Sequence, residues 1–506
     1  MKNKQSETAR SVARNIIYGF STWILPIGLS FYATPKIVRA LGSQDYGIYV
    51  LVLGFAGYSF NISFGRSIVK YIAEYRSKSE EHKISGLLSA AAFISITAGL
   101  TSAGILCLSS SWLVKTVFNI EAASQDKTIT ALYLTSLIVF VLMQNQIFSS
   151  VLQGIHRFDI YSKVLNLNNL ILITGNLVLA ANGFGLIGLF TWNLFVSSLT
   201  GAIYAIFAKR HLPEFRFTSK FTLGDLKIVG FYSAGIIGAQ ILSNIIILFE
   251  RGWITQQIGA ESLTYYIIPL TLALYLHGFV ASFIIVMFPL ASELKNDKEK
   301  LLRLYTKATK IVCLFVFFFA ATLITEGNLF LTLWLGADFA AKSSSLLVIQ
   351  TIALSFLAIQ TVSWQMTDGL GYSRYNFYLL VLCLITTISF MVLLIKDFGT
   401  SGVAVARMIG LALVFLSIFF VKKWFFAHVQ KIFWFKLILI LTISSILSAI
   451  LQIIIIRNFA VNWPTFVVAT ISGALVYGLI VWSLNFINED EKILMRQIIG
   501  ISGKSA

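Results

Sequence analysis

The feature that most constrains this chain is a succession of apolar stretches, each roughly the 20 residues that a helix needs to span the hydrocarbon core of a bilayer. Of the 506 residues, 57% are hydrophobic and only 12% are charged. Soluble domains carry about 25% charged residues, so these charges are too few to cover a water-exposed surface. The composition excludes a soluble globular fold, and we expect the chain to cross a membrane many times.

Hydropathy predicts fourteen transmembrane spans, so the expected fold class is an all-α integral membrane protein. A β-barrel is excluded because the apolar stretches do not alternate in polarity as barrel strands do. The predicted spans are residues 15–34, 47–66, 84–107, 131–153, 164–182, 186–208, 226–249, 263–289, 308–325, 345–366, 376–395, 401–421, 434–456 and 464–485. No connecting segment is long enough for an additional domain.

Lysine and arginine gather in alternate connecting segments, which accounts for the formal net charge of +17. The basic clusters lie in residues 2–14, 66–83, 209–227, 295–310 and 422–436. The positive-inside rule places this side in the cytoplasm, and the even span count places both termini there. The clusters form no continuous basic face, so we expect membrane lipids around the chain and no nucleic-acid partner.

Three sequence patterns recur along the chain in the same order. Leu41-Gly42-Ser43-Gln44 with Tyr49 resembles Ile258-Gly259-Ala260-Glu261 with Tyr266, Gly154 matches Gly369, and residues 184–188 match residues 398–402, at offsets of 217, 215 and 214 residues. Each pair occupies the same point of the span pattern. An internal duplication is therefore expected, as in many transporters.

The duplication predicts a six-helix N-terminal half (1–214), a six-helix C-terminal half (215–430), and two extra helices with a cytoplasmic tail (431–506). Because six is even, both halves enter the membrane from the same side and form parallel repeats. Two similar bundles leave a cleft between them that can open alternately to each face. This geometry is typical of a transporter rather than of a receptor or an anchor.

Two motifs resemble those of a known family, the polysaccharide-exporter flippases of the O-antigen (Wzx) type. Residues 41–49, with the sequence LGSQDYGIY, resemble the glycine-acid-glycine-tyrosine signature that follows the first helix of that family. Phe249-Glu250-Arg251, followed by Ile258-Gly259, is similar to the acid-arginine pair that ends its seventh helix. The sequence departs from the family at Glu250, where aspartate is usual, and at Tyr266, where the second glycine-tyrosine copy is degraded.

This resemblance covers at least the first twelve spans and implies membership of the multidrug/oligosaccharidyl-lipid/polysaccharide exporter superfamily. It implies a V-shaped bundle in the bacterial inner membrane that flips undecaprenyl-diphosphate-linked oligosaccharide to the periplasmic face by alternating access. The oligosaccharide would be the repeat unit of O-antigen, capsule or exopolysaccharide. A polysaccharide polymerase and the export machinery are further expected partners.

Two other functions stay open from the sequence. An ion-coupled multidrug exporter of the same superfamily would need acidic residues facing the cleft of the N-terminal half, and almost none are present. A membrane-embedded glycan polymerase or ligase would present a long catalytic outer loop, whereas the longest one here is roughly Cys107 to Thr130. No phosphate-binding loop and no His or Cys set at metal-ligand spacing is found, so we expect a transporter without a cofactor.

Arginines inside or beside spans are candidates for binding an anionic diphosphate. Arg407 lies within the twelfth predicted span, where a charge costs about 2.5–3.5 kcal/mol on insertion scales. Arg66 follows the second span, where it could meet a diphosphate that enters from the cytoplasm. The alternatives are a structural ion pair for Arg407 and an ordinary positive-inside anchor for Arg66.

The seventh and eighth spans carry three further candidates. Glu250 and Arg251 are adjacent, so on a helix they point about a hundred degrees apart and cannot face one neighbour together. Arg251 could meet substrate while Glu250 contacts another helix, or both could simply end the span. His277 lies well inside a span and could titrate near neutral pH, although a lone histidine can equally be a hydrogen-bonded core residue.

Two amide-rich stretches could bind sugars, because amides form hydrogen bonds without the desolvation cost of a charge. They are residues 144–146, with Asn145, and residues 166–169, with Asn169. Hydrogen bonding between helices is the alternative role for both. Asp368 and Arg374, and His156 at the equivalent place of the first half, are expected to fix loops.

Overall fold

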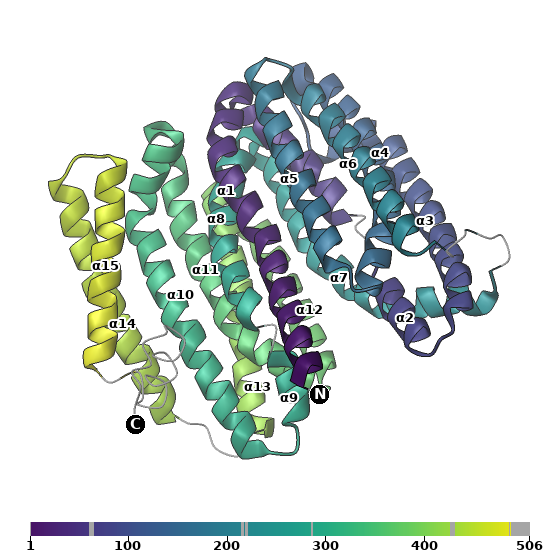
Figure 1. Cartoon of the computed structure of the whole chain (residues 1–506). Helices are drawn as coiled ribbons and strands as arrows, with labels where there is room; N and C mark the ends of the chain where they lie inside the picture. Colours follow the sequence, from purple (N-terminus) through teal and green to yellow (C-terminus); the bar gives the residue numbers. More distant parts are fainter. Residues whose placement is uncertain are drawn as a thin grey trace. The chain divides into compact units, whose positions relative to one another are not determined.

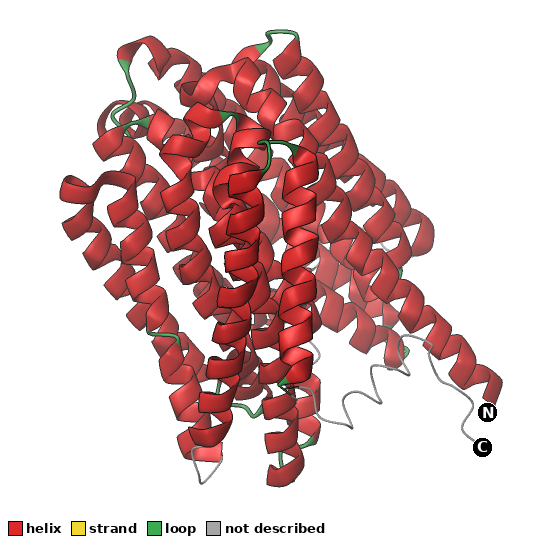
Figure 2. Cartoon of the chain, turned by 90° about the vertical axis from the view of Figure 1, so that its left-hand side faces the viewer, coloured by secondary structure: helices red, strands yellow, loops and turns green. Residues whose placement is uncertain are grey.

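The computed structural model describes residues 2–59, 65–213, 217, 221–284, 287–425, 431–484 and 486. This part of the chain consists of α-helices joined by short turns and contains no β-strand (Figure 2). Ten helical stretches within it are long and apolar enough to cross a bilayer. The prediction of an all-α membrane protein is confirmed.

The helices run in chain order as labelled in Figure 1. The earlier ones are α1 (Lys2–Gly54), α2 (Gly65–Ser77), α3 (Ile84–Trp112), α4 (Ala122–Gly154), α5 (Phe158–Ala181), α6 (Gly185–His211) and α7 (Leu223–Ile258). The later ones are α8 (Ala260–Ile284), α9 (Met287–Glu293), α10 (Lys298–Leu335), α11 (Ala337–Gly369), α12 (Ser373–Ala412), α13 (Phe415–Phe425), α14 (Lys431–Asn458) and α15 (Trp463–Ser483).

Among the described residues, four connections between helical segments consist of a single glycine. α1 kinks at Gly42 and α12 kinks at Gly399, so each of these helices carries one predicted span and the beginning of the next. Gly259 alone separates α7 from α8, and Gly336 alone separates α10 from α11. Gly42, Gly259 and Gly336 adopt φ of 78°, 110° and 106° with ψ of 158°, 161° and 163°, a region that only glycine occupies readily.

Backbone turns of positive φ recur along the chain at the offsets of the sequence repeat. The matching pairs are Gly42 and Gly259, Asn119 and Gly336, His156 and Gly371, and Gly185 and Gly399. Similar turns at similar spacing support an internal duplication. The boundaries of the two halves at residues 214 and 430 stay a prediction.

The helices group into two compact units, residues 1–264 and 265–506. In the first unit, α7 packs against α2 and α3. Ile72, Leu88 and Val151 are completely buried where α2, α3 and α4 meet. Gly154 allows α4 to approach α2, because a Cβ at this glycine would lie 2.9 Å from the Cβ of Ile72.

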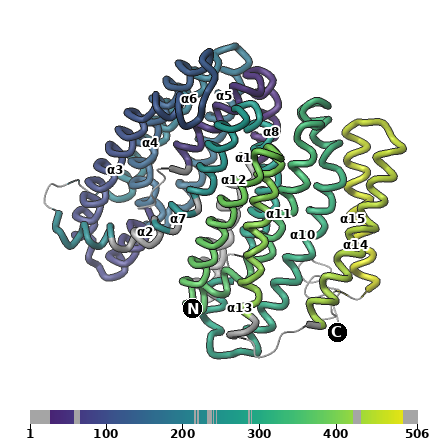
Figure 3. The backbone as a smooth tube through the Cα atoms, turned by 180° about the vertical axis from the view of Figure 1, so that it is seen from behind, coloured from purple at the N-terminus to yellow at the C-terminus, as the bar shows by residue number. Residues whose placement is uncertain are grey.

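In the second unit, α10 packs against α11 through Val312, Val316 and Val362, which are at most 1% exposed. On another side α10 contacts α14 and α15, and Figures 1 and 3 both show these helices next to one another. The hydroxyl of Ser448 donates to the carbonyl of Gly473 at 2.9 Å and joins α14 to α15. The predicted two extra helices therefore form a hairpin that packs on α10.

Candidate functional site

A cavity of about 200 Å³ lies inside the first unit, between α4, α5, α6 and the helical turn Phe55–Ser59 that continues α1. Its lining residues, which define what we call the amide cavity, are Ala56, Gly57, Val139, Leu142, Met143, Asn145, Gln146, Ser149, Tyr161, Leu165 and Tyr204. A water molecule takes about 30 Å³ in the liquid, so the amide cavity has room for several waters or for part of a polar ligand.

α4 contributes one face to the amide cavity. Leu142, Asn145, Gln146 and Ser149 follow the three- and four-residue spacing that places side chains on the same side of a helix. Three of these four side chains are polar although they lie within an apolar span. A polar helix face inside a membrane protein is expected to meet protein or water rather than lipid.

Asn145 is held in place by α6. Its Nδ2 donates to the carbonyl oxygen of Ser197 at 2.8 Å. Its Oδ1 lies against Gly201, where a Cβ would approach within 2.0 Å of that oxygen. The absence of a side chain at Gly201 therefore allows the carboxamide to sit between α4 and α6, beside the amide cavity.

Two tyrosines form another wall of the amide cavity. The rings of Tyr161 on α5 and Tyr204 on α6 stack with centroids 6.0 Å apart and planes 19° apart. The hydroxyl of Tyr204 donates to the backbone carbonyl of Tyr161 at 3.3 Å. The cavity thus combines neutral amides and a hydroxyl with aromatic faces, a set that can form hydrogen bonds without introducing a charge.

The acid-arginine pair on α7 lies outside the lining of the amide cavity. Arg251 donates from Nη1 to the carbonyl of Val50, and its Cδ would lie 3.1 Å from a Cβ at Gly54. It therefore ties α7 to the last turns of α1, just before the turn that reaches the cavity at Gly57. Glu250 is completely buried.

Arg66 and Asn169 also lie outside the lining. Arg66 is exposed at the beginning of α2, next to Gly65, which packs closely on Ser150 of α4. Asn169 accepts a hydrogen bond from Asn168 at 3.4 Å on α5. Of the predicted substrate-binding residues, Asn145 is the one that the described lining includes.

The two remaining candidates belong to the second unit. Arg407 is 9% exposed and lies on α12 beyond the kink at Gly399. His277 on α8 is half-buried, and its Nε2 lies 3.4 Å from the hydroxyl of Thr361 on α11. A buried arginine within a span stays a candidate for anion binding. The contact of His277 with Thr361 does not decide between a core role and the predicted functional role.

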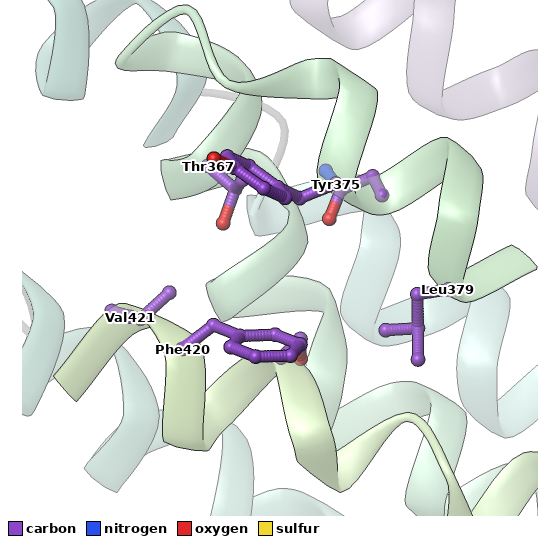
Figure 4. Close-up of a pocket in the computed structure, with 7 residues that line it drawn as sticks. Thr367, Tyr375, Leu379, Phe420 and Val421 are labelled. Carbon is purple, nitrogen blue, oxygen red and sulfur yellow. The ribbon is translucent and has the colours of Figure 1, made fainter. Parts of the chain in front are cut away.

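A smaller pocket lies between α11, α12 and α13 in the second unit. Figure 4 shows Thr367 and Tyr375 on one side of it, with Phe420 and Val421 on the other. Its volume of about 10 Å³ admits no more than about one water molecule. It has no room for a sugar, so the amide cavity is the better candidate site.

The turn between α11 and α12 is fixed by side chains beside this pocket. Asn376 donates to Oδ1 of Asp368 at 2.8 Å and to the carbonyl of Trp364 at 3.0 Å. Asp368 thus holds the first turn of α12 against the end of α11. In the first unit, Arg157 instead pairs with Asp159 at 3.0 Å, within its own loop and the start of α5.

Sequence reasoning singled out the amide-rich stretch 144–146, which includes Asn145 and Gln146, but it did not find Ser149 or the two tyrosines of the amide cavity. Tyr161 and Tyr204 lie in predicted spans among many other aromatic residues, so nothing in the sequence distinguishes them. The helical spacing from Asn145 to Ser149 is a usable signal, because it extends the polar face of α4 by one turn.

Comparisons with known proteins identify the family of this chain. Residues 12–295 match the model of the family described as "Polysaccharide biosynthesis protein". A Shigella flexneri protein named "Putative O-antigen transporter" is 19% identical over 414 residues, which are 78% of this chain and 94% of that protein. A Bacillus subtilis (strain 168) protein named "Uncharacterized membrane protein EpsK" is 23% identical over 349 residues, 66% of this chain and 67% of that protein.

Solved structures share the fold. The lipid II flippase MurJ in an inward closed conformation superposes with a TM-score of 0.75 at 16% identity, over 96% of this chain and 100% of that one. An inward-facing multidrug resistance MATE transporter of the MOP superfamily gives 0.66 at 14% identity, over 80% of this chain and 94% of that one. The chain therefore belongs to the polysaccharide biosynthesis protein family, and it shares its fold with MurJ and MATE proteins.

Proposed function

We propose that this protein flips a lipid-linked oligosaccharide across the bacterial cytoplasmic membrane, from the cytoplasmic to the outer face, by alternating access. The substrate class is an undecaprenyl-diphosphate-linked repeat unit of O-antigen, capsule or exopolysaccharide. The family match and the Shigella flexneri relative named for O-antigen transport support this proposal. The fold shared with a lipid II flippase agrees with it.

The amide cavity is the observation that carries the proposal. A sugar hydroxyl both donates and accepts hydrogen bonds, as do the side chains of Asn145, Gln146 and Ser149. The ring faces of Tyr161 and Tyr204 offer apolar surface to the C–H face of a sugar. Neutral groups suit a glycan that must be released again, because they bind without a strong charge interaction.

The diphosphate of the substrate needs cationic partners. Arg66 is exposed at the start of α2, in the basic segment 66–83 that we assign to the cytoplasmic side. An arginine there can form charge-assisted, bidentate hydrogen bonds with a phosphate that enters from the cytoplasm. We assign Arg251 and Arg407, which lie within apolar helices, to later steps of the passage.

The distribution of basic residues supports the proposed orientation, with both termini in the cytoplasm. In this orientation the basic segments contact the inner surface of the membrane, where anionic lipids attract them. We propose the polysaccharide polymerase and export machinery as the proteins that receive the flipped saccharide.

Deletion of the gene in its host tests the proposal. Undecaprenyl-linked oligosaccharide on each membrane face should be measured after add-back of wild type, Gln146→Leu, Tyr161→Leu and Arg407→Ala. We expect accumulation on the cytoplasmic face that wild type relieves and these variants do not. Gln125→Leu is the matched control, because Gln125 lies on the same helix but does not line the amide cavity.

An unchanged distribution of lipid-linked saccharide in the deletion strain would refute the flippase proposal. The next measurement would then be drug accumulation, since the MATE fold is shared as well. If the distribution changes but the cavity variants behave like wild type, the flippase function stands and the amide cavity is not the glycan site.

A further inference from the structure

A polar cluster lies where α10, α14 and α15 meet, and it contains none of the residues discussed above as substrate contacts. The hydroxyl of Thr470 on α15 lies 2.6 Å from Oε2 of Glu326 on α10. Gln452 on α14 donates from Nε2 to the hydroxyl of Thr322, one turn before Glu326, at 3.2 Å. We call these four side chains the Glu326 cluster.

The Glu326 cluster is shielded from water. Glu326 is 1% exposed and Gln452 is completely buried. One turn beyond Glu326, the ring of Phe330 contacts Trp463 and Phe466 of α15, with centroids 6.0 Å and 5.7 Å apart. These aromatic rings lie between the cluster and the end of the α14–α15 hairpin.

No cation neutralises Glu326 within the described part of the chain. Its single hydrogen-bond partner there is Thr470, and it forms no ion pair. In the described structure, none of the other titratable groups on the helices packed around Glu326 forms an ion pair or a hydrogen bond with it. These groups are Asp338, Lys342 and Asp368 on α11, Lys436 and Arg457 on α14, Tyr477 on α15, and Lys298–Lys310 with Tyr305 and Cys313 on α10. An ionised carboxylate at this place would be a buried charge without a counter-charge, which is strongly unfavourable.

The Glu326 cluster has fewer hydrogens to donate than it has hydrogen-bond acceptors. The hydroxyl of Thr470 lies 2.6 Å from Oε2 of Glu326 and 2.9 Å from the carbonyl of Phe466, but it has one hydrogen to donate. In addition, Oε1 of Glu326 and Oε1 of Gln452 are buried without a hydrogen-bond partner in the described structure. Buried acceptors are costly when unsatisfied, so acceptors outnumber donors here.

We propose that Glu326 is a proton-binding site and that its carboxyl group is neutral in the folded protein. As a carboxylic acid, Glu326 donates to one acceptor of the cluster and leaves the hydrogen of Thr470 for the carbonyl of Phe466. A proton also removes the buried charge without needing extra volume. A metal ion would need several more oxygen ligands, whereas α14 and α15 pack so closely that a Cβ at Gly473 would lie 2.2 Å from Nε2 of Gln452.

The bound proton joins the C-terminal hairpin to α10. Glu326 links α10 to α15 through Thr470, and Thr322 links α10 to α14 through Gln452. Loss of the proton leaves a carboxylate in this junction and weakens the contact of α14 and α15 with α10. This inference does not depend on which substrate is transported.

The experiment measures the thermal unfolding midpoint of the purified full-length protein in detergent from acidic to alkaline pH. Glu326→Gln keeps a neutral side chain of the same shape, and Glu299→Gln is the matched control on the exposed side of α10. Below the pH at which Glu326 loses its proton, wild type and Glu326→Gln should have similar midpoints. As pH rises, wild type should lose stability relative to Glu326→Gln but not relative to Glu299→Gln.

Equal pH dependence of wild type and Glu326→Gln would overturn the proposal. A wild-type midpoint that rises with sodium chloride but not with choline chloride, and an insensitive Glu326→Gln variant, would assign the cluster to sodium instead. If Glu326→Gln does not fold, infrared spectroscopy of wild type and Thr470→Val tests whether Glu326 carries a proton. The carbonyl band of a protonated carboxyl should be present in wild type at neutral pH and shifted in Thr470→Val, and its absence would contradict the proton.

Discussion

The contact between Asn145 and Gly201 allows a quantitative test of how the amide cavity is built. In Gly201→Ala, the new Cβ would meet Oδ1 of Asn145 at 2.0 Å and Cγ at 2.9 Å, so the carboxamide must move. Overpacking costs about 1–3 kcal/mol. Loss of the Asn145 bond to Ser197 costs about 1 kcal/mol more. Alanine gains about 0.5–1 kcal/mol over glycine in a helix, which leaves a net loss of about 1–3.5 kcal/mol.

A double-mutant cycle with Asn145→Ala measures this contact directly. The free energy of unfolding should be determined by denaturant in mixed micelles for wild type, both single variants and the double variant. Truncation of Asn145 vacates the space that the new methyl group needs. The double variant should therefore be more stable than the sum of the single effects predicts, by about 0.5–3 kcal/mol.

Additivity of the two substitutions within about 0.5 kcal/mol would refute this account of the cavity wall. Gly104→Ala on α3 is the control for the general effect of replacing a helical glycine, because a Cβ there meets no atom within 4 Å. It should be neutral or slightly stabilising.

Three further predictions concern other parts of the fold. Gly42→Ala should destabilise the protein by about 1–3 kcal/mol in denaturant unfolding, because its φ and ψ suit only glycine although the space beside it is open. Gly473→Ala should lower the thermal midpoint, since the methyl group would collide with Gln452 and separate α14 from α15. A hydrogen bond from the backbone N–H of Lys300 lowers the pKa of Asp297 at the start of α10. The stabilising contribution of the Asp297 carboxylate is therefore present at neutral pH and lost as pH falls through the lowered pKa, so the thermal unfolding midpoint of wild type should fall in acid. Asp297→Asn should remove this fall.

Hydropathy predicted the apolar part of the long helices but not where the helices end, and it did not predict the short amphipathic helix α2. α10 begins at Lys298 and continues to Leu335, whereas the ninth span was predicted over residues 308–325. Hydropathy reports which residues suit the lipid, while backbone hydrogen bonds continue a helix through polar residues on either side. For this reason Glu326, one residue past the predicted span, was not recognised as a buried group.

The site was harder to predict than the fold because it depends on contacts between helices that are distant in sequence. Asn145 could be found as an amide within a span. Tyr161 and Tyr204 acquire their place only when α5 and α6 pack beside α4. The family motifs identify segments rather than a cavity: Arg251 donates to the backbone carbonyl of Val50 and lies outside the lining of the amide cavity, and its contact with substrate stays a prediction.

The connections made by a single glycine also limit where this chain can accept inserted or deleted residues. At Gly42, Gly259, Gly336 and Gly399, the glycine alone connects one helical segment to the next. Because no loop can absorb an inserted or deleted residue at such a point, the change would alter the direction and the rotation of the following helix and move its buried face out of contact. Epitope tags and natural insertions should therefore be rejected at these four positions and accepted in longer connections such as residues 459–462.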